Sequence, residues 1–413
     1  MQKLVSETPS VAPVDTLVQS TFPFVLALTF AHLLNDVMQS LIPAIYPIIK
    51  DNYALSFGQI GLITLAFQLT ASLLQPLVGI YTDRRPSAYS TIIGMACTLF
   101  GLLVLSRAGS FGSLLLGSAI VGTGSSIFHP EAVRMARAAS GGRHGFAQSL
   151  FQVGGQTGQA IGPLLAAFIV VPRGQASLAW FSVIALVAMA VLYRVGTWYQ
   201  QHSLELAAQL PGKAAARKSG GRSLDPTIPV IVLIVLMLSK SAYTSSLSNY
   251  LTFYFIEKFH ATLQASQMLL FVFLASQAVG SLIGGYVGDR IGRHEIIWFS
   301  ILGALPFTLL LPYAGLTASV VLIVLIGMIM ASAFPAILVY ALDLLPGKIG
   351  MVAGAFYGLT FGLGALSAAL LGKVADLTSL TAVFKFCSYL PLIGLMTWFL
   401  PRLEGGGGAM GRD

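Results

Sequence analysis

The chain has 413 residues, of which 56% are hydrophobic and only 9% are charged. A soluble protein of this length carries about a quarter of its residues as charged ones, so the composition excludes a soluble globular domain and indicates a protein that crosses the lipid bilayer many times. The net charge of +8 comes from basic residues spread among loops. Because they build no patch, the sequence predicts no nucleic-acid partner.

Apolar stretches of membrane-spanning length recur along the chain. A helix of about 20 apolar residues crosses the hydrocarbon core of a bilayer. Such stretches lie at about 22–49, 57–81, 88–106, 111–133, 145–171, 177–198, 228–256, 264–288, 295–313, 317–343, 350–373 and 382–400. The sequence therefore predicts an all-α membrane protein with twelve transmembrane helices.

One long polar stretch, residues 200–227, divides the chain. It contains Lys213, Arg217, Lys218 and Arg222 together with two prolines. We expect an N-terminal six-helix bundle in residues 1–199, a linker in 200–227, and a C-terminal six-helix bundle in 228–413 that ends in a short tail.

The loop charges predict the orientation, because Lys and Arg are enriched in cytoplasmic loops. With the N-terminus inside, the inner loops hold most of the 23 Lys and Arg residues. The outer loops hold only Lys50, Arg107, Arg173, Lys258, Lys373 and Lys385. Both termini and the linker are therefore expected in the cytoplasm.

The two halves repeat each other. Gly79–Arg84 aligns with Gly285–Arg290 at an offset of 206 residues, and Pro130 aligns with Pro335 at an offset of 205. Repeats of half the chain in a helical membrane protein are typical of transporters with their binding site between the halves, although a channel or a structural protein can also be duplicated.

These repeated segments resemble the loops of the major facilitator superfamily, which carry a Gly, an Asp-Arg pair, and then a Gly and an Arg. The second copy matches this pattern at Gly285, Asp289, Arg290, Gly292 and Arg293. The first copy departs from it, since Pro86 and Ser87 stand where Gly and Arg are expected. The resemblance implies the major facilitator fold of two pseudo-symmetric six-helix bundles.

An Asp at a helix end beside basic residues can hold neighbouring helices by charge-assisted bonds and release them when the halves move. We therefore expect a gating role for Asp83, Arg84, Arg85, Asp289, Arg290 and Arg293. The alternative is that the arginines only anchor the topology.

A second motif, Gly158-x-x-x-Gly162-Pro163, resembles the antiporter motif of the same superfamily. Small residues allow close approach of helices, and Pro163 can kink its helix. The motif is assigned to gating, with generic close packing as the alternative.

The most extensive resemblance covers His32–Ser40, Gly122–Gly155 and Leu344–Gly354, which are similar to the bacterial fosmidomycin-resistance transporters. That family exports a phosphonate antibiotic in exchange for protons. The resemblance implies a proton-coupled antiporter of the bacterial inner membrane that exports a fosmidomycin-like phosphonate or a related small anion by alternating access. Because residues do not give the direction of transport, the alternative is a proton-coupled symporter that imports a sugar or organic anion on the same fold.

Polar residues in the first apolar stretch are the first candidates for proton coupling. His32, Asn35, Asp36 and Gln39 share one helical face, and Asp36 is the only charged residue of the stretch. A carboxylate at bilayer depth normally faces a bundle interior or a cavity, and His titrates near neutrality. The pair His32 and Asp36 can therefore hold a proton, although a structural hydrogen bond is the alternative for Asp36.

The fourth stretch adds His129, Glu131 and Arg134 around Pro130, which frees backbone groups that need polar partners. We expect proton coupling by His129 and Glu131. The planar guanidinium of Arg134 can hold a phosphonate, or Arg134 is only an inner-loop anchor.

Lys240 is the only Lys or Arg in the central part of an expected helix, and it aligns with Leu34 in the repeat. It can neutralise a phosphonate or pair with Asp36. Four glutamines share one face of the fifth stretch, at 148, 152, 156 and 159. The substrate-binding residues expected are Arg134, Lys240, Gln39, Gln152, Gln156, Tyr243 and Asn249.

The sequence contains no Walker loop, no Cys/His metal-ligand spacing and no nucleophile elbow. We therefore expect no enzymatic activity, no cofactor and no metal site, and a monomeric transporter driven by an ion gradient. A membrane receptor or scaffold is disfavoured because few large soluble regions exist.

Overall fold

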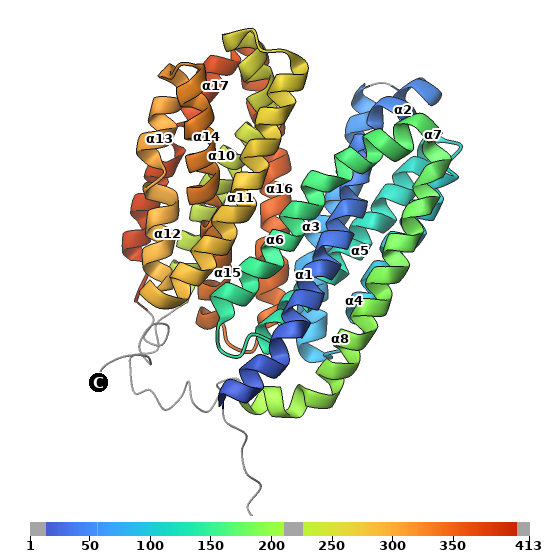
Figure 1. Cartoon of the computed structure of the whole chain (residues 1–413), viewed down its shortest axis with the longest axis vertical. Coiled ribbons are helices and arrows are strands. Elements are labelled where there is room, and N and C mark those ends of the chain that lie inside the picture. The colour runs from blue at the N-terminus through green and yellow to red at the C-terminus, as the bar shows by residue number, and fades with distance from the viewer. Residues whose placement is uncertain (1–13, 56, 210–225, 403–413) are drawn as a thin grey trace, which may run out of the picture.

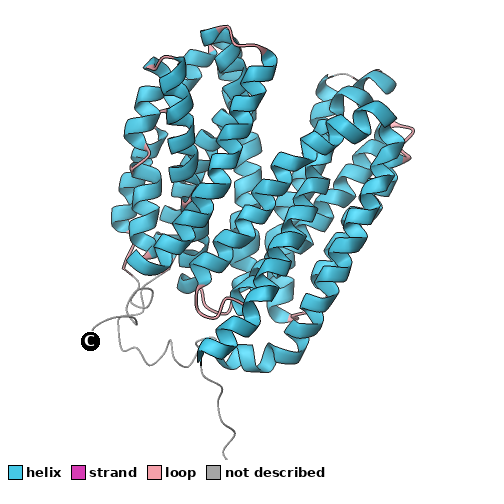
Figure 2. Cartoon of the chain, in the orientation of Figure 1, coloured by secondary structure: helices cyan, strands magenta, loops and turns pink. Residues whose placement is uncertain are grey.

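The computed structural model describes residues 14–55, 57–209 and 226–402, which are helical apart from short turns and loops (Figure 2). The all-α prediction is confirmed. The first half contains α1 (Val14–Ala44), α2 (Tyr46–Asn52), α3 (Phe57–Arg84), α4 (Ser90–Ser106), α5 (Phe111–Ala138), α6 (His144–Leu165), the π-helix η1 (Ala166–Val170), α7 (Val171–Arg173), the 3₁₀-helix η2 (Gln175–Phe181) and α8 (Ser182–Gln209).

The second half is built in the same way. It contains α10 (Thr227–Phe259), α11 (Leu263–Ile291), α12 (Arg293–Leu302), α13 (Leu305–Leu310), the 3₁₀-helix η3 (Leu311–Tyr313), α14 (Leu316–Ala331), α15 (Ala333–Leu344), α16 (Ile349–Leu377), α17 (Leu380–Cys387) and the 3₁₀-helix η4 (Leu390–Phe399). α8 continues to Gln209, past the expected start of the linker at residue 200. Most of the expected linker, residues 210–225, lies outside the described residues.

Ten helical segments of the described ranges are long and apolar enough to cross a membrane. Two of the twelve predicted stretches form helices that are not among these ten. α4 has only 17 residues, and the glutamine-rich α6 has a more polar sequence. The helical membrane fold is confirmed. Ten of the twelve predicted transmembrane helices are confirmed as long and apolar enough to span a membrane.

The two halves meet at one end of the molecule and diverge at the other (Figure 1). α3 packs along α16, and α6 packs along α11. We call the end where the halves meet the closed end; it contains the C-termini of α3 and α11 and the N-termini of α6 and α16. α2 and α7 lie at the opposite, open end (Figure 1).

The repeated glycines explain the close contact between the halves. A Cβ atom on Gly79 would collide with the backbone carbonyl of Gly350, and one on Gly285 would collide with the side chain of Ser149. Both glycines therefore allow a helix of one half to approach a helix of the other half at backbone distance.

Candidate functional site

A cavity of about 480 Å³ lies between the two halves. α1 and α6 contribute His32, Asp36 and Gln156, and α10 of the other half contributes Lys240 and Asn249. Most of the remaining lining residues carry hydroxyl or amide groups. The volume lies within the range of small-molecule sites, which is roughly 300–1,000 Å³, and the polar lining suits a small hydrophilic ligand.

Asp36 lies at the centre of a buried cluster. One carboxylate oxygen, Oδ1, accepts a hydrogen bond of 3.0 Å from Asn35 Nδ2, and the other, Oδ2, accepts one of 2.9 Å from Gln159 Nε2. His32 Nε2 lies 3.6 Å from Oδ2, and His129 Nε2 lies 3.8 Å from Oδ1. Three of the residues expected to bind protons are thus in contact, although they come from two helices.

Close packing of α1 on α6 builds this cluster. A Cβ atom on Gly158 would collide with the carbonyl of Leu33, and one on Gly162 would collide with Ser40. The glycines of the motif that resembles an antiporter signature therefore bring α1 against α6. Gly155 leaves room for the cluster itself, since a Cβ atom there would lie 2.5 Å from His32 Nε2 and 2.9 Å from Asp36 Oδ2.

Glu131 is buried, but it lies outside this cluster and does not line the cavity between the halves. Its carboxylate accepts a hydrogen bond of 3.0 Å from Ser90 Oγ and lies 3.4 Å from Arg134 Nη2. Arg134 in turn donates to the carbonyl of Thr82 and to the carboxylate of Asp83, both at 2.6 Å. The structure therefore places Arg134 at the closed end rather than beside the cavity.

Two aspartates join the halves at the closed end. Asp83, in the last turn of α3, accepts backbone N–H bonds from Gly350 and Met351 at 2.8 and 2.9 Å. Asp289, in the last turn of α11, accepts backbone N–H bonds from Gly145 and Phe146 at 2.9 and 2.8 Å. The first turn of a helix has unpaired N–H groups and partial positive charge, so each carboxylate stabilises a helix of the opposite half.

Asp343 forms a third contact there. It pairs with Arg137 of the N-terminal half, at 2.5 Å, and with Arg293 of its own half. Arg137 is not among the gating residues expected from the sequence. The only sequence feature that points to it is its place in the last turn of α5. Arg84, Arg85 and Arg290 are exposed, and in the described part of the chain none of the three forms an ion pair; Arg290 stacks on Tyr286 at 4.1 Å.

Lys240 is buried at the cavity, and its Nζ atom lies 5.5 Å from the centre of the Phe334 ring. Within the described ranges it forms no ion pair. Asn249 also lines the cavity and donates to the carbonyl of Ser245 at 2.8 Å. Gln152 and Gln156 line it as well, whereas Gln39 and Tyr243 are buried outside it.

Tyr357 of α16 was not expected at the site. Its hydroxyl accepts a hydrogen bond from Gln148 Nε2 and donates one to Gln152 Oε1, both at 3.0 Å. Its ring centre lies 4.9 Å from that of His129. This side chain joins the glutamine face of α6 to the C-terminal half at the edge of the cavity.

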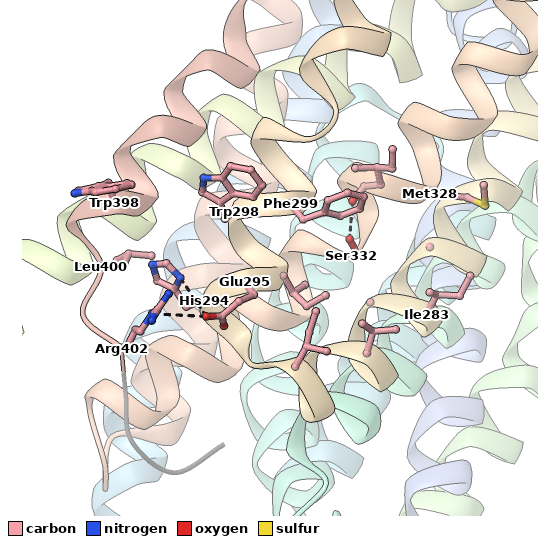
Figure 3. A pocket seen from close by; sticks show the side chains of 16 residues that line it. Ile283, His294, Glu295, Trp298, Phe299, Met328, Ser332, Trp398, Leu400 and Arg402 are labelled. Atoms are coloured by element: carbon pink, nitrogen blue, oxygen red, sulfur yellow. Dashed lines mark hydrogen bonds and ion pairs between the residues drawn. The ribbon is translucent and has the colours of Figure 1, made fainter. Parts of the chain in front are cut away.

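A larger cavity of about 1010 Å³ lies within the C-terminal half, between α11, α12, α14 and η4 (Figure 3). Its walls are mainly apolar, with Trp298, Phe299, Met328 and Trp398. Only its edge is charged, where Arg402 lies 3.7 Å from Glu295. Transporters built from such repeats bind their ligands between the halves, so the cavity between the halves is the candidate site.

The fold and the site define a secondary-transporter architecture, and the chain belongs to the Major Facilitator Superfamily, whose sequence model matches residues 28–256 and 230–409. The Fosmidomycin resistance protein of Escherichia coli (strain K12) is 52% identical over 388 residues, which is 94% of each chain. An uncharacterized MFS-type transporter of Bacillus subtilis (strain 168), YfnC, is 37% identical over 92% of this chain and 93% of its own. The resemblances to the major facilitator superfamily and to the fosmidomycin-resistance transporters are thereby confirmed.

Solved structures support the same fold. The transporter FucP in its outward conformation has a TM-score of 0.72 at 16% identity, covering 92% of this chain and 99% of its own. The proton:xylose symporter XylE has a TM-score of 0.74 at 14% identity, covering 93% and 96%. The chain is thus a membrane transporter rather than an enzyme, as its family and relatives indicate.

Proposed function

We propose that this transporter exports a small phosphonate anion of the fosmidomycin kind in exchange for protons, by alternating access. One observation carries the proposal: a single cavity is lined by Asp36 and His32 from one half and by Lys240 from the other. The cavity thus combines groups that can hold a proton with a cation that can hold an anion. The 52% identical relative is a fosmidomycin resistance protein, which supports a phosphonate as the cargo.

Lys240 and the glutamines supply the anion-binding groups in this proposal. Lys240 forms no ion pair with a described residue, so its ammonium group is available to an anionic ligand. Gln152 and Gln156 add amide donors from α6. An ammonium group binds a phosphonate as a point charge, while amides orient it without adding charge, which favours release when the site opens to the other side.

The buried cluster supplies the proton site. His32, Asp36 and His129 are each at most 2% exposed. Because His32 and Asp36 line the cavity, protons reach the cluster from there. A cargo molecule that fills the cavity covers Asp36 and His32 and blocks that route. Exchange requires that proton and cargo occupy the site in turn. Their shared use of the cavity produces this alternation.

The driving force suits export of an anion. If one proton enters for each monoanion that leaves, both movements carry positive charge inward. Each charge that crosses gains about 2.3 kcal/mol per 100 mV of inside-negative potential. The pH gradient adds to this for the proton, so such an exchange concentrates the anion outside.

The closed end is the proposed gate. Asp83, Asp289 and Asp343 join the halves there, and their bonds must break before the cavity opens on that side. The loop charges support a cytoplasmic position for this end and both termini. We therefore propose that the structure is an outward-facing state, and that the protein works as a monomer in the bacterial inner membrane.

Transport by purified protein in liposomes tests the proposal. Inside-out vesicles with an acidic interior, from which protons flow outward, should accumulate fosmidomycin. A protonophore should abolish the accumulation. Asp36→Asn should retain fosmidomycin binding but lose the response to the gradient. Accumulation that is indifferent to the gradient excludes antiport, and accumulation that requires protons to move with the drug identifies symport. In cells, export should lower the drug content.

A further inference from the structure

The cluster around Asp36 brings three potential metal ligands together. His32 Nε2, His129 Nε2 and the Asp36 carboxylate all lie within 4.8 Å of one another, and all three side chains are buried. His32 and Asp36 are four residues apart on α1 and present their ligand atoms on one helical face. His129 comes from α5 and lies 3.8 Å from the other carboxylate oxygen, Oδ1.

The hydrogen bonds of the imidazoles define which nitrogens are free. His32 Nδ1 lies 2.7 Å from the carbonyl oxygen of Phe151, and His129 Nδ1 lies 2.9 Å from that of Ser125. A carbonyl oxygen only accepts, so Nδ1 carries the hydrogen in both rings. In the neutral rings both Nε2 atoms therefore present lone pairs toward the carboxylate of Asp36.

This arrangement can accept a cation. Two nitrogen lone pairs and an ionised carboxylate repel one another unless a proton or a metal ion lies between them. His129 Nε2 is buried and forms no hydrogen bond with any described residue. Histidines that bind metals usually donate their second ring N–H to a backbone carbonyl or a carboxylate, and both imidazoles here do so.

We propose that His32, Asp36 and His129 form a binding site for a divalent transition-metal ion of the zinc class. Imidazole nitrogens with one carboxylate suit Zn²⁺, Ni²⁺ or Co²⁺ and disfavour Mg²⁺ and Ca²⁺. The ligand atoms of a tetrahedral zinc site lie about 3.3 Å apart, as follows from bonds of 2.0–2.1 Å. His32 Nε2 lies 3.6 Å from Oδ2 and His129 Nε2 lies 3.8 Å from Oδ1, and the three ligand atoms all lie within 4.8 Å of one another, so the imidazoles must move inward to close around an ion.

The surroundings fix the ligands and leave a way in. Asn35 and Gln159 donate to the two carboxylate oxygens and orient Asp36. His32 and Asp36 also line the cavity, so an ion can enter and a fourth position can be filled from the cavity by water or an anion. The sequence did not indicate this site, because its ligands lie on two helices and show no local metal-binding spacing. The proposal does not depend on proton-coupled transport.

The test is a titration of purified, tag-free, chelator-treated protein with Co²⁺. Four-coordinate Co²⁺ gives intense visible absorption bands, which six-coordinate aqueous Co²⁺ lacks. We expect one Co²⁺ per chain with such bands, displaced by Zn²⁺. His32→Gln and His129→Gln should each weaken Co²⁺ binding at least about tenfold, and Asp36→Asn should do the same while keeping the shape of the side chain.

His202→Gln is the matched control, because His202 bonds to the carbonyl of Trp198 in its own helix, outside the cluster. It should bind Co²⁺ like the unchanged protein. Elution of each variant as a single folded species excludes misfolding. Absence of the bands, or equal affinity in the His32→Gln/His129→Gln double variant, would overturn the site. Gradient-driven transport by metal-free protein is measured separately, so failure of either proposal is distinguishable from failure of the other.

Discussion

Asp83 and Asp289 lie 206 positions apart in the sequence and form equivalent contacts across the two halves. Asp83 of α3 accepts two N–H bonds from the first turn of α16, and Asp289 of α11 accepts two from the first turn of α6. Because the sequence repeats, two equivalent carboxylate contacts join the halves at the closed end. Each contact joins a carboxylate of one half to a helix N-terminus of the other.

Removing one of these charges should open the closed end. Hydrogen bonds to charged groups contribute about 1.5–3 kcal/mol, so Asp83→Asn or Asp289→Asn should shift the equilibrium toward the inward-open state by roughly 10- to 100-fold. Spin labels on the exposed positions Ser87 and Lys348, after replacement of the two native cysteines, would report the separation of the halves.

Glu257→Gln is the control for this experiment, because Glu257 is an exposed acid at the end of α10. It should leave the distance distribution unchanged. If both aspartate variants keep the distribution of the unchanged protein, the contacts at the helix N-termini do not determine which end is closed.

A second prediction concerns Asp343, which holds arginines from both halves. A double-mutant cycle of Arg137→Gln and Asp343→Asn should give a coupling energy of about 0.5–3 kcal/mol in thermal unfolding of the purified protein. The exposed pair Arg402 and Glu295 should give no more than about 1 kcal/mol. Equal coupling energies in the two cycles would show that the Arg137–Asp343 pair stabilises the protein no more than an exposed ion pair.

The helices and their repeat could be predicted from the sequence because apolar length and turn residues are local properties. The His32 and Asp36 pair could also be predicted, since the spacing of four residues fixes a shared helical face. The partners of Arg134 could not, because a long side chain at a helix end can turn toward the cavity or the gate. Packing of α5 on α3 decides this in favour of Asp83.

The two tyrosines illustrate the same limit. Tyr243 was expected at the cavity but is buried in the apolar core of the C-terminal half. Tyr357 was not expected there, yet it bonds to two glutamines of α6. Its position depends on how the two halves pack against each other, and no local sequence pattern encodes that packing.

A third prediction tests the space that Gly155 leaves. The methyl group of Gly155→Ala would lie against His32 Nε2 and Asp36 Oδ2, so it should separate the two side chains. We expect loss of at least about tenfold in gradient-driven transport, with folding retained. Gly112→Ala is the matched helical control, because its Cβ would meet only Ser110 Oγ at 4.0 Å. Normal transport by Gly155→Ala would show that the cluster tolerates the displacement.

The last prediction concerns Lys240, the basic residue that lines the cavity between the halves. Charge-assisted bonds of this kind contribute about 1.5–3 kcal/mol, so Lys240→Gln should weaken fosmidomycin binding roughly 10- to 100-fold. Lys385→Gln removes an exposed lysine that does not line the cavity and should leave the affinity unchanged. Binding is measured by calorimetry with purified protein. Lys240→Arg should retain part of the affinity, because it keeps the charge but not the shape of the group. Equal affinity in Lys240→Gln and the unchanged protein would mean that the amides of α6, rather than a cation of α10, hold the anion.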